Sequence, residues 1–333
     1  MGLLASKLLF KSIKYISLNT LIKTSKKKNL LPFYHTVSDE ILPHVENLYQ
    51  VKKINEFKSD LDFICKYYKS ISIDEVLNLK TPIRKIKKPV FHLSFDDGLK
   101  EIRTVIAPIL LERGIHATFF INSDFIDNRD LFYRFKVSLI INELKKIINS
   151  EIEKKIEIVL KSKPFNFRTK LLALTWNDIL IIDQIGELLN IDFGEYLNRK
   201  PYLSSEDIIW LSEKGFSIGA HSENHPRYKD ISLLEQIKQT NGSLKYLEDN
   251  FNIQKKLFAF PFSDNGVTLD YFNHKNLIPN YSFGTSGLRE DVVVFNLQRM
   301  SLELFDLSAE SIIKAYYLKY IIKKLYKSNL INR

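Results

Sequence analysis

Short apolar segments alternate with helical segments through most of this 333-residue chain. Several apolar segments are hydrophobic at nearly every position, as strands are when both faces of their sheet are covered. Strands that alternate with helices indicate a parallel sheet. The expected strands are residues 30–35, 90–95, 117–122, 216–221, 257–262, 281–285 and 292–297. About seven strands in this order predict an α/β fold whose parallel sheet is a closed or nearly closed barrel.

One long stretch departs from this alternation. Residues 127–200 show helical periodicity and no clear strand. We interpret them as a helical insertion between two barrel strands, placed over the mouth, where it acts either as a substrate-shaping lid or in simple packing. The predicted organisation is a basic N-terminal segment (1–30), a barrel with its insertion (31–305) and a basic C-terminal helix (306–333).

The net charge of +10 is concentrated in two tails. Residues 1–30 hold seven lysines and no acidic residue, and residues 311–333 hold six lysine or arginine residues and no acidic residue. Between them, 39 acidic residues face 36 basic ones, so we expect no nucleic-acid partner. Basic tails that also carry Leu, Ile and Tyr favour peripheral contact with an anionic membrane. The alternative is that they are solvated helices packed on the body.

The sequence gives no sign of export or of a membrane-spanning segment. No apolar run approaches the roughly 18 residues of a spanning helix. Lysines interrupt the start, MGLLASKLLFKSIKYISL, every few positions, which is unlike the apolar region of a signal peptide. We therefore expect a cytoplasmic protein, peripheral at the inner face of the membrane. The single cysteine, Cys65, allows no disulfide framework.

Two of the predicted strands end in groups that can perform chemistry. VFHLSFDDG ends in Asp96 and Asp97, and FSIGAHSENHP supplies His221 and His225. Because catalytic side chains of such barrels come from the carboxyl ends of the strands, we expect these four to converge. One carboxylate and two imidazoles form a three-ligand set typical of a catalytic divalent metal, and the second carboxylate is then a general base.

The segments SFDDG, GIHATFFIN, GFSIGAHSENHP and LFAFPFS, in this order, resemble the polysaccharide deacetylase family, the chitooligosaccharide-deacetylase-like carbohydrate esterases. The resemblance covers about residues 30–300 apart from the insertion. It implies a distorted (β/α) barrel and metal-dependent hydrolysis of N-acetyl groups on amino sugars. It also implies that Asp96 is the catalytic base. Asp97, His221 and His225 are the implied ligands of one divalent metal ion, for which zinc is expected.

The chain departs from the family's commonest form near its last strand. It reads FNLQRMSLE where the family usually has a histidine after a leucine. Some relatives carry a Tyr-His pair on the first strand, and LPFYHTV supplies His35 there, so His35 is the candidate general acid. The alternative is a structural histidine at a strand end. Pro261, Phe262 and Ser263 resemble the family's substrate-site wall. Arg299 is a candidate contact for a carboxylate or phosphate of the substrate.

Together these features predict a metal-dependent hydrolase that removes N-acetyl groups from amino sugars of a bacterial envelope polysaccharide or its precursor. The expected partner is an N-acetylated glycan or sugar-lipid. Two alternatives stay open at this point. One is an amidase that uses the same metal centre on a non-carbohydrate substrate, and the other is a non-catalytic glycan-binding module that kept the fold.

Overall fold

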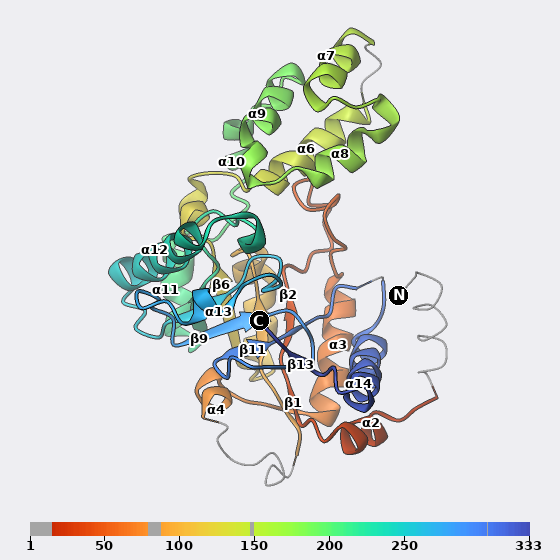
Figure 1. Ribbon diagram of the computed structural model, residues 1–333, viewed down its shortest axis with the longest axis vertical. Coiled ribbons are helices and arrows are strands. Elements are labelled where there is room, and N and C mark those ends of the chain that lie inside the picture. The colour runs from red at the N-terminus through yellow and green to blue at the C-terminus, as the bar shows by residue number, and fades with distance from the viewer. Residues whose placement is uncertain (1–14, 79–87, 147–149, 305) are drawn as a thin grey trace.

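An eight-stranded sheet forms the centre of the protein in a computed structural model, which describes residues 15–78, 88–146, 150–304 and 306–333 (Figure 1). Its order is β11-β9-β8-β7-β6-β5-β2-β12, and every pairing is parallel. The strands are β2 (Pro32–Tyr34), β5 (Leu93–Phe95), β6 (Ala117–Ile121), β7 (Ser217–Ala220), β8 (Leu257–Ala259), β9 (Tyr281–Gly284), β11 (Asn296–Gln298) and β12 (Met300–Ser301).

One stretch of chain closes this sheet. Strand β11 pairs with β9 at one edge, and β12 pairs with β2 at the other. Only Arg299 lies between β11 and β12, so the two edges of the sheet are joined by consecutive residues. The sheet is therefore rolled into a nearly closed (β/α) barrel, as the sequence predicted.

The predicted strands agree with the observed ones except in the last. Six of the seven expected segments contain a strand of the barrel, although β8 ends at Ala259, before Pro261. The segment 292–297 was only partly right, because β11 begins at Asn296. Val293 N–H instead donates to Asp291 Oδ1 at 3.0 Å, and Val294 is 86% exposed, so the chain turns there.

Several short strands lie outside the barrel sheet. Strands β1 (Asn29–Leu30), β4 (Val90–Phe91) and β3 (Lys69–Ser70) form a small parallel sheet. Strands β10 (Glu290–Asp291) and β13 (Leu330–Ile331) form a second one. Strand β4 lies within the predicted segment 90–95 and β1 overlaps the predicted segment 30–35, whereas β3, β10 and β13 were not predicted, because two-residue strands carry too few positions for a periodic pattern.

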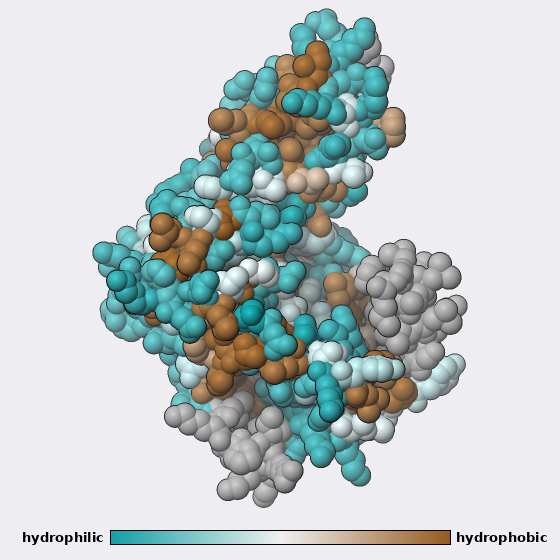
Figure 2. Space-filling view, viewed as in Figure 1, coloured by the Kyte–Doolittle hydropathy of each residue, from teal (hydrophilic) through white to brown (hydrophobic). Residues whose placement is uncertain are grey.

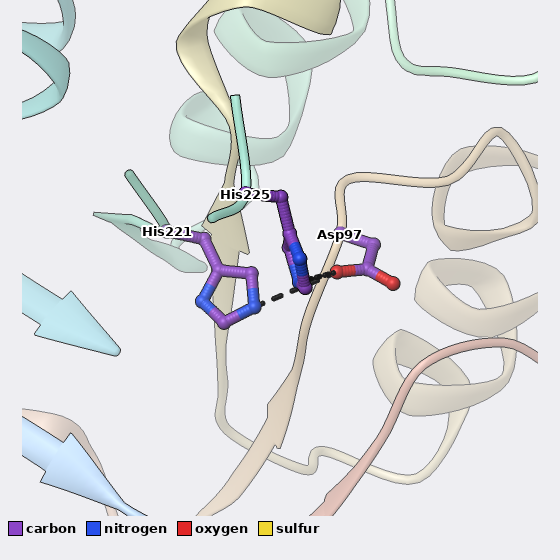
Figure 3. A group of neighbouring side chains, drawn as sticks. All are labelled: Asp97, His221 and His225. Carbon is purple, nitrogen blue, oxygen red and sulfur yellow. Dashed lines mark ion pairs between the residues drawn. The ribbon is translucent and has the colours of Figure 1, made fainter. Parts of the chain in front are cut away.

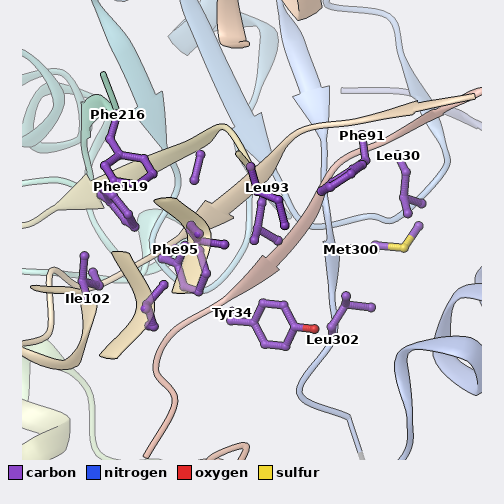
Figure 4. Close-up of a cluster of buried hydrophobic side chains, with 14 of the residues drawn as sticks. Leu30, Tyr34, Phe91, Leu93, Phe95, Ile102, Phe119, Phe216, Met300 and Leu302 are labelled. Atoms are coloured by element: carbon purple, nitrogen blue, oxygen red, sulfur yellow. The ribbon is translucent and has the colours of Figure 1, made fainter. Parts of the chain in front are cut away.

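Aromatic and aliphatic side chains of neighbouring elements fill the main core (Figure 4). Phe95 and Phe119 are fully buried, with ring centroids 5.6 Å apart, and Phe119 lies 5.1 Å from Phe216. Burying rings of this size is the largest favourable contribution that single side chains make to such a core. The strand that ends in Asp96 is thus fixed by its own apolar residues.

Helices surround the barrel and cover its sheet (Figure 1). They are α2 (Leu18–Ser25), α3 (Ile54–Tyr67), α4 (Ile73–Leu77), α5 (Ala107–Glu112), α11 (Ser205–Glu213), α12 (Leu233–Phe251), α13 (Leu269–Phe272) and α14 (Ala309–Leu325). A π-helical turn at Ile102–Ile106 leads into α5. Within the described ranges, no helix has the length and apolar character that crossing a bilayer requires.

Most of the residues between β6 and α11 form a helical lobe beyond one end of the barrel (Figure 1). Its helices are α6 (Tyr133–Leu144), α7 (Ser150–Leu160), α8 (Phe167–Ala173), α9 (Ile179–Leu188) and α10 (Phe193–Leu197). The lobe has an apolar core of its own, to which Phe135 and Ile182 contribute. Its surface is mixed, and Figure 2 shows apolar residues among polar ones on the face in view.

A buried polar cluster ties Arg333 to the loops of the barrel. Asp264 accepts hydrogen bonds from Asn296 Nδ2 at 2.9 Å and from Gln298 Nε2 at 2.7 Å. The Arg333 guanidinium forms ion pairs with both Asp264 and Asp291. All three charged side chains are at most 3% exposed, so the two carboxylates depend on this one cation for neutralisation.

We expect Arg333→Ala to lower the free energy of unfolding by about 3–5 kcal/mol, because it leaves buried carboxylates unpaired. Urea denaturation of the purified protein measures this change. Lys327→Ala removes an exposed positive charge nearby in sequence and should change the free energy by less than about 0.5 kcal/mol. Equal stability of the two variants would show that the buried cluster contributes nothing specific.

Candidate active site

A tight turn after β5 presents the two adjacent carboxylates. The backbone of Asp97 and of Gly98 is left-handed, with φ of 71° and 64°. A side chain at position 98 would meet Ile121 Cγ2 at 2.9 Å, so glycine is needed there for space as well as for conformation. Neighbouring side chains on an extended strand point in opposite directions, and this turn removes that restriction. Asp96 can then reach Arg299, and Asp97 can reach His221 and His225.

The two histidines follow β7 on a loop that is also tightly folded. His221 N–H donates to the Ile121 carbonyl at 2.9 Å and so continues the pairing with β6. Ser222 and His225 both have positive φ, 70° and 62°, and His225 N–H donates to Ser222 Oγ at 3.0 Å. These bonds return the chain so that both rings face the end of β5.

Three of the predicted residues meet at one point (Figure 3). Asp97 Oδ1 lies 3.1 Å from His225 Nε2 and 3.5 Å from His221 Nε2. The three ligand atoms lie within 4.8 Å of one another, and all three residues are buried. The strand ends that the sequence predicted to converge do lie together.

The protonation of this cluster suits a cation. His221 Nδ1 lies 2.8 Å from the Ala259 carbonyl, which can only accept, so this nitrogen carries the proton. Burial lowers the pKa of His221 to about 4, so the ring is neutral at pH 7 and its Nε2 presents a lone pair. That lone pair faces Asp97 Oδ1, which has no hydrogen-bond partner among the described residues. Two electron-rich atoms buried face to face fit a bound metal ion.

Aromatic rings fix the second histidine. His225 Nδ1 has no hydrogen-bond partner among the described residues, whereas a metal-binding histidine usually has one. Instead, its ring packs against Phe132 with centroids 4.3 Å apart and against Phe262 at 4.7 Å. Phe132 caps α6, so the helical lobe contributes directly to the site. Nothing in the sequence singled out Phe132.

The predicted wall residues are only partly in contact with this cluster. Phe262 packs on His225, as described. Pro261 and Ser263 form the turn after β8, in which Ser263 N–H donates to the Pro261 carbonyl at 2.6 Å. Within the described chain, neither Pro261 nor Ser263 forms a hydrogen bond or ion pair with the three clustered residues.

Asp96 is held by a buried arginine. Arg299 Nη1 donates to Asp96 Oδ1 at 2.7 Å, and Arg299 Nη2 donates to Asp96 Oδ2 at 2.9 Å. The guanidinium also lies over the rings of Phe33 and Phe120. Burial alone would raise the pKa of Asp96, but the charge and hydrogen bonds of Arg299, together with His221 and His35, outweigh burial and lower that pKa, so Asp96 is ionised at neutral pH.

Arg299 was predicted to contact substrate, and the structure places it differently. Its side chain is 1% exposed, and both terminal nitrogens are bound to Asp96. The arrangement therefore favours a role in positioning and charging Asp96. No local sequence pattern indicates this pairing, because the two residues lie 203 positions apart.

His35 follows β2 and pairs with Glu303. Nδ1 of His35 lies 2.5 Å from Glu303 Oε2, and the backbone N–H of His35 donates to Glu303 Oε1 at 2.9 Å. Burial favours a low pKa for His35, but Glu303 and, more weakly, Asp97 and Asp96 raise it to about 9. The His35 side chain is 26% exposed, against 5% or less for Asp97, His221 and His225. Glu303 carries no sequence motif and was missed.

Comparison with known proteins identifies the family of this chain. The family model described as polysaccharide deacetylase matches residues 84–276, which include Asp96, Asp97, His221 and His225. The chain belongs to the polysaccharide deacetylase family. This deacetylase is thus a hydrolase that acts on the amide bond of N-acetyl groups of carbohydrates. None of the curated protein sequences matches it.

Solved structures of deacetylases share the fold of this deacetylase. The deacetylase PplD of Streptococcus pyogenes, in complex with acetate, is 16% identical with a TM-score of 0.52, and the match covers 87% of this chain and 98% of PplD. IcaB of Ammonifex degensii is 13% identical with a TM-score of 0.53, covering 87% and 97%. A de-N-acetylase from Aggregatibacter actinomycetemcomitans is 13% identical with a TM-score of 0.54, covering 86% and 99%.

We expect His35 of the metal-free deacetylase to titrate near pH 9. Because this pKa lies above the roughly 6.5 of an unfolded chain, the pair with Glu303 stabilises the fold fully below about pH 6.5. That contribution is lost as the pH rises through 9. Glu303→Gln should therefore lower the pKa of His35 and destabilise the protein more at pH 6 than at pH 10.

NMR titration of the histidine ring protons and urea denaturation at the two pH values measure these effects. Glu310→Gln changes an exposed, distant glutamate and should leave the His35 titration unchanged. A native His35 that titrates below pH 7 would contradict the assigned ion pair.

Proposed function

We propose that this deacetylase removes N-acetyl groups from amino sugars of a bacterial envelope polysaccharide or of its precursor. The observation that carries the proposal is the convergence of Asp97, His221 and His225, whose ligand atoms lie within 4.8 Å of one another. We propose that they hold one divalent metal ion. Zinc suits two imidazoles and a carboxylate with further positions open.

The metal and the protein groups have separate tasks in this proposal. When bound, a divalent ion supplies Lewis-acid chemistry, which polarises a carbonyl oxygen and makes water more acidic. Asp96, kept ionised by Arg299, takes the proton of the water that attacks the acetamide carbon. The C–N bond then breaks, acetate leaves, and the amine nitrogen needs a proton.

His35 is our proposed source of that proton. Glu303 raises the pKa of His35 to about 9, so the imidazole is protonated at neutral pH and has a proton to give. Glu303 Oε2 accepts from Nδ1, which leaves the Nε2–H of His35 available to donate. The partial exposure of His35 allows a substrate to reach it. These features favour a general acid over the structural alternative.

We propose a glycan or sugar-lipid as the substrate, encountered at the cytoplasmic face of the inner membrane. Membership in the family supports a carbohydrate and an enzyme over an amidase for other substrates or a binding module. PplD, which was solved with acetate, is consistent with acetate as the product. The membrane contact rests on the basic character of residues 311–333 and of residues 1–30, of which 1–14 lie outside the described residues.

We also propose the division of the chain that the sequence indicated. Its parts are the basic N-terminal segment (1–30), the barrel (31–305) and the basic C-terminal helix (306–333). The position of the helical lobe between β6 and β7 supports an insertion near 127–200.

Asp96→Asn should lower kcat for acetate release by at least about 100-fold while metal content stays the same, because the general base is lost. The substrates are N-acetylated oligosaccharides and lipid-linked sugars, each assayed with and without chelator. Asp62→Asn, an exposed aspartate outside the site, is the matched control and should keep full activity. Undiminished acetate release by folded Asp96→Asn would refute the role of Asp96. Release from none of the carbohydrates would refute the proposed substrate class.

Asp97→Asn should weaken zinc binding by at least about 100-fold, since loss of a residue that merely supports a ligand already costs about 10- to 100-fold. Competition with a chromophoric chelator measures the affinity directly, without any activity assay. His116→Ala removes an exposed imidazole and should bind zinc as the native protein does. If native and Asp97→Asn proteins bound zinc equally, the three-residue site would be wrong.

A further inference from the structure

A cavity of about 250 Å³ lies between the segment after β9 and helix α14. Arg289, Lys319 and Lys323 supply its charged lining, and Thr285 and Ser286 supply hydroxyl groups. Among the residues that the structure describes, no acidic side chain lines it, and none of its lining residues belongs to the candidate active site. We call this cavity the basic pocket.

The cations of the basic pocket lack anionic partners within the described part of the chain. Arg289 Nη2 donates to the carbonyls of Ser328 and Leu330, while its buried Nε–H has no hydrogen-bond partner there. Neither Lys319 nor Lys323 forms an ion pair with a described carboxylate. The pocket therefore gathers three positive charges and an unused donor.

Two further observations indicate that the three cations lie close together and are not neutralised by a nearby carboxylate. Burial lowers the pKa of Lys323, and the charges of Arg289 and Lys319 lower it further, as repulsion between close like charges requires. The nearby Glu290 does not relieve them, because Lys27 Nζ binds its carboxylate at 2.6 Å. An anion inside the pocket would remove this repulsion.

The residues that follow the pocket along α14 have the character of a membrane-contacting segment. Leu325 is 77% exposed and Tyr326 is 79% exposed, although both are apolar or aromatic. Exposed lysines, Lys324 and Lys327, flank them. Such a segment suits the surface of an anionic bilayer. Leu325 and Tyr326 can enter the boundary between headgroups and acyl chains, while the flanking lysines stay at the lipid phosphates.

We propose that the basic pocket binds a phosphate group, supplied by the headgroup of an anionic phospholipid. Phosphate fits because its oxygens accept from guanidinium, ammonium and hydroxyl donors together. Leu325 and Tyr326 then lie at the membrane surface. This inference deepens the membrane contact proposed above and rests on it, since it assigns that contact to a defined pocket of α14.

The test uses the full-length protein and two matched double variants. Lys319→Gln/Lys323→Gln removes two charges from the pocket, and Lys324→Gln/Lys327→Gln removes two charges outside it, one in the last turn of α14 and one just after that helix. The first arm is calorimetric titration with inorganic phosphate. The second is co-sedimentation with phosphatidylcholine vesicles, with and without phosphatidylglycerol. Melting temperatures verify that both variants fold.

We expect saturable phosphate binding by the native protein and by the outer-lysine variant, and none by the pocket variant. Binding to phosphatidylglycerol vesicles should fall at least about tenfold in the pocket variant, and less in the outer-lysine variant. Any phosphate bound at the proposed metal site is common to all three proteins, so the difference between them reports the pocket alone.

Equal losses in both double variants would overturn the pocket in favour of diffuse attraction. Phosphate binding without vesicle binding would support the phosphate site and refute the lipid headgroup as its source. Acetate release by the native protein, measured in parallel, tests the proposed function separately. Activity without either kind of binding overturns this inference alone, and binding without activity overturns only the proposed function.

Discussion

A buried ion pair between Arg299 and Asp96 couples closure of the barrel to the chemistry at its mouth. Arg299 occupies the one position between β11 and β12, the two short strands that join opposite edges of the sheet. Asp96 stands at the end of β5, which is separated from β12 by β2 alone. Loss of either partner leaves a buried charge unpaired, which lowers the free energy of unfolding by about 3–5 kcal/mol. Closure of the barrel therefore places beside Asp96 the buried cation that helps to keep it ionised.

The sequence predicted the parts of this architecture that depend on local patterns. Fully apolar strands, and the polar residues directly after them, are visible in any one segment, so Asp97, His221 and His225 could be grouped in advance. Arg299 and Glu303 could not be given their partners, because their roles depend on which strands the closing segment joins. The turn at Val293 was missed for a related reason, since a run of valines is equally apolar in a strand and in a turn.

The helical lobe contributes more than its own packing. Its Phe132 lies on the ring of His225, a residue whose Nδ1 lacks the hydrogen bond that normally orients a metal-binding imidazole. Ring contacts with Phe132 and Phe262 orient His225 instead. The insertion was expected to be either a substrate-shaping lid or simple packing, and the contact of Phe132 with His225 gives it a further role, because one of its residues supports the site.

The charges around the site explain why its carboxylates have different tasks. Asp96 is neutralised by Arg299, and Glu303 is neutralised by the protonated His35. Asp97 pairs with no described lysine or arginine and faces the rings of His221 and His225, and the Nδ1 proton of His221 is committed to the Ala259 carbonyl. A buried carboxylate without its own cation is costly, and a divalent ion is the partner that two imidazoles and that carboxylate can jointly accept. Because Asp96 and Glu303 each have a cation of their own, neither competes for a metal. Asp96 stays charged and can take up a proton, and Glu303 holds His35, the proposed proton donor.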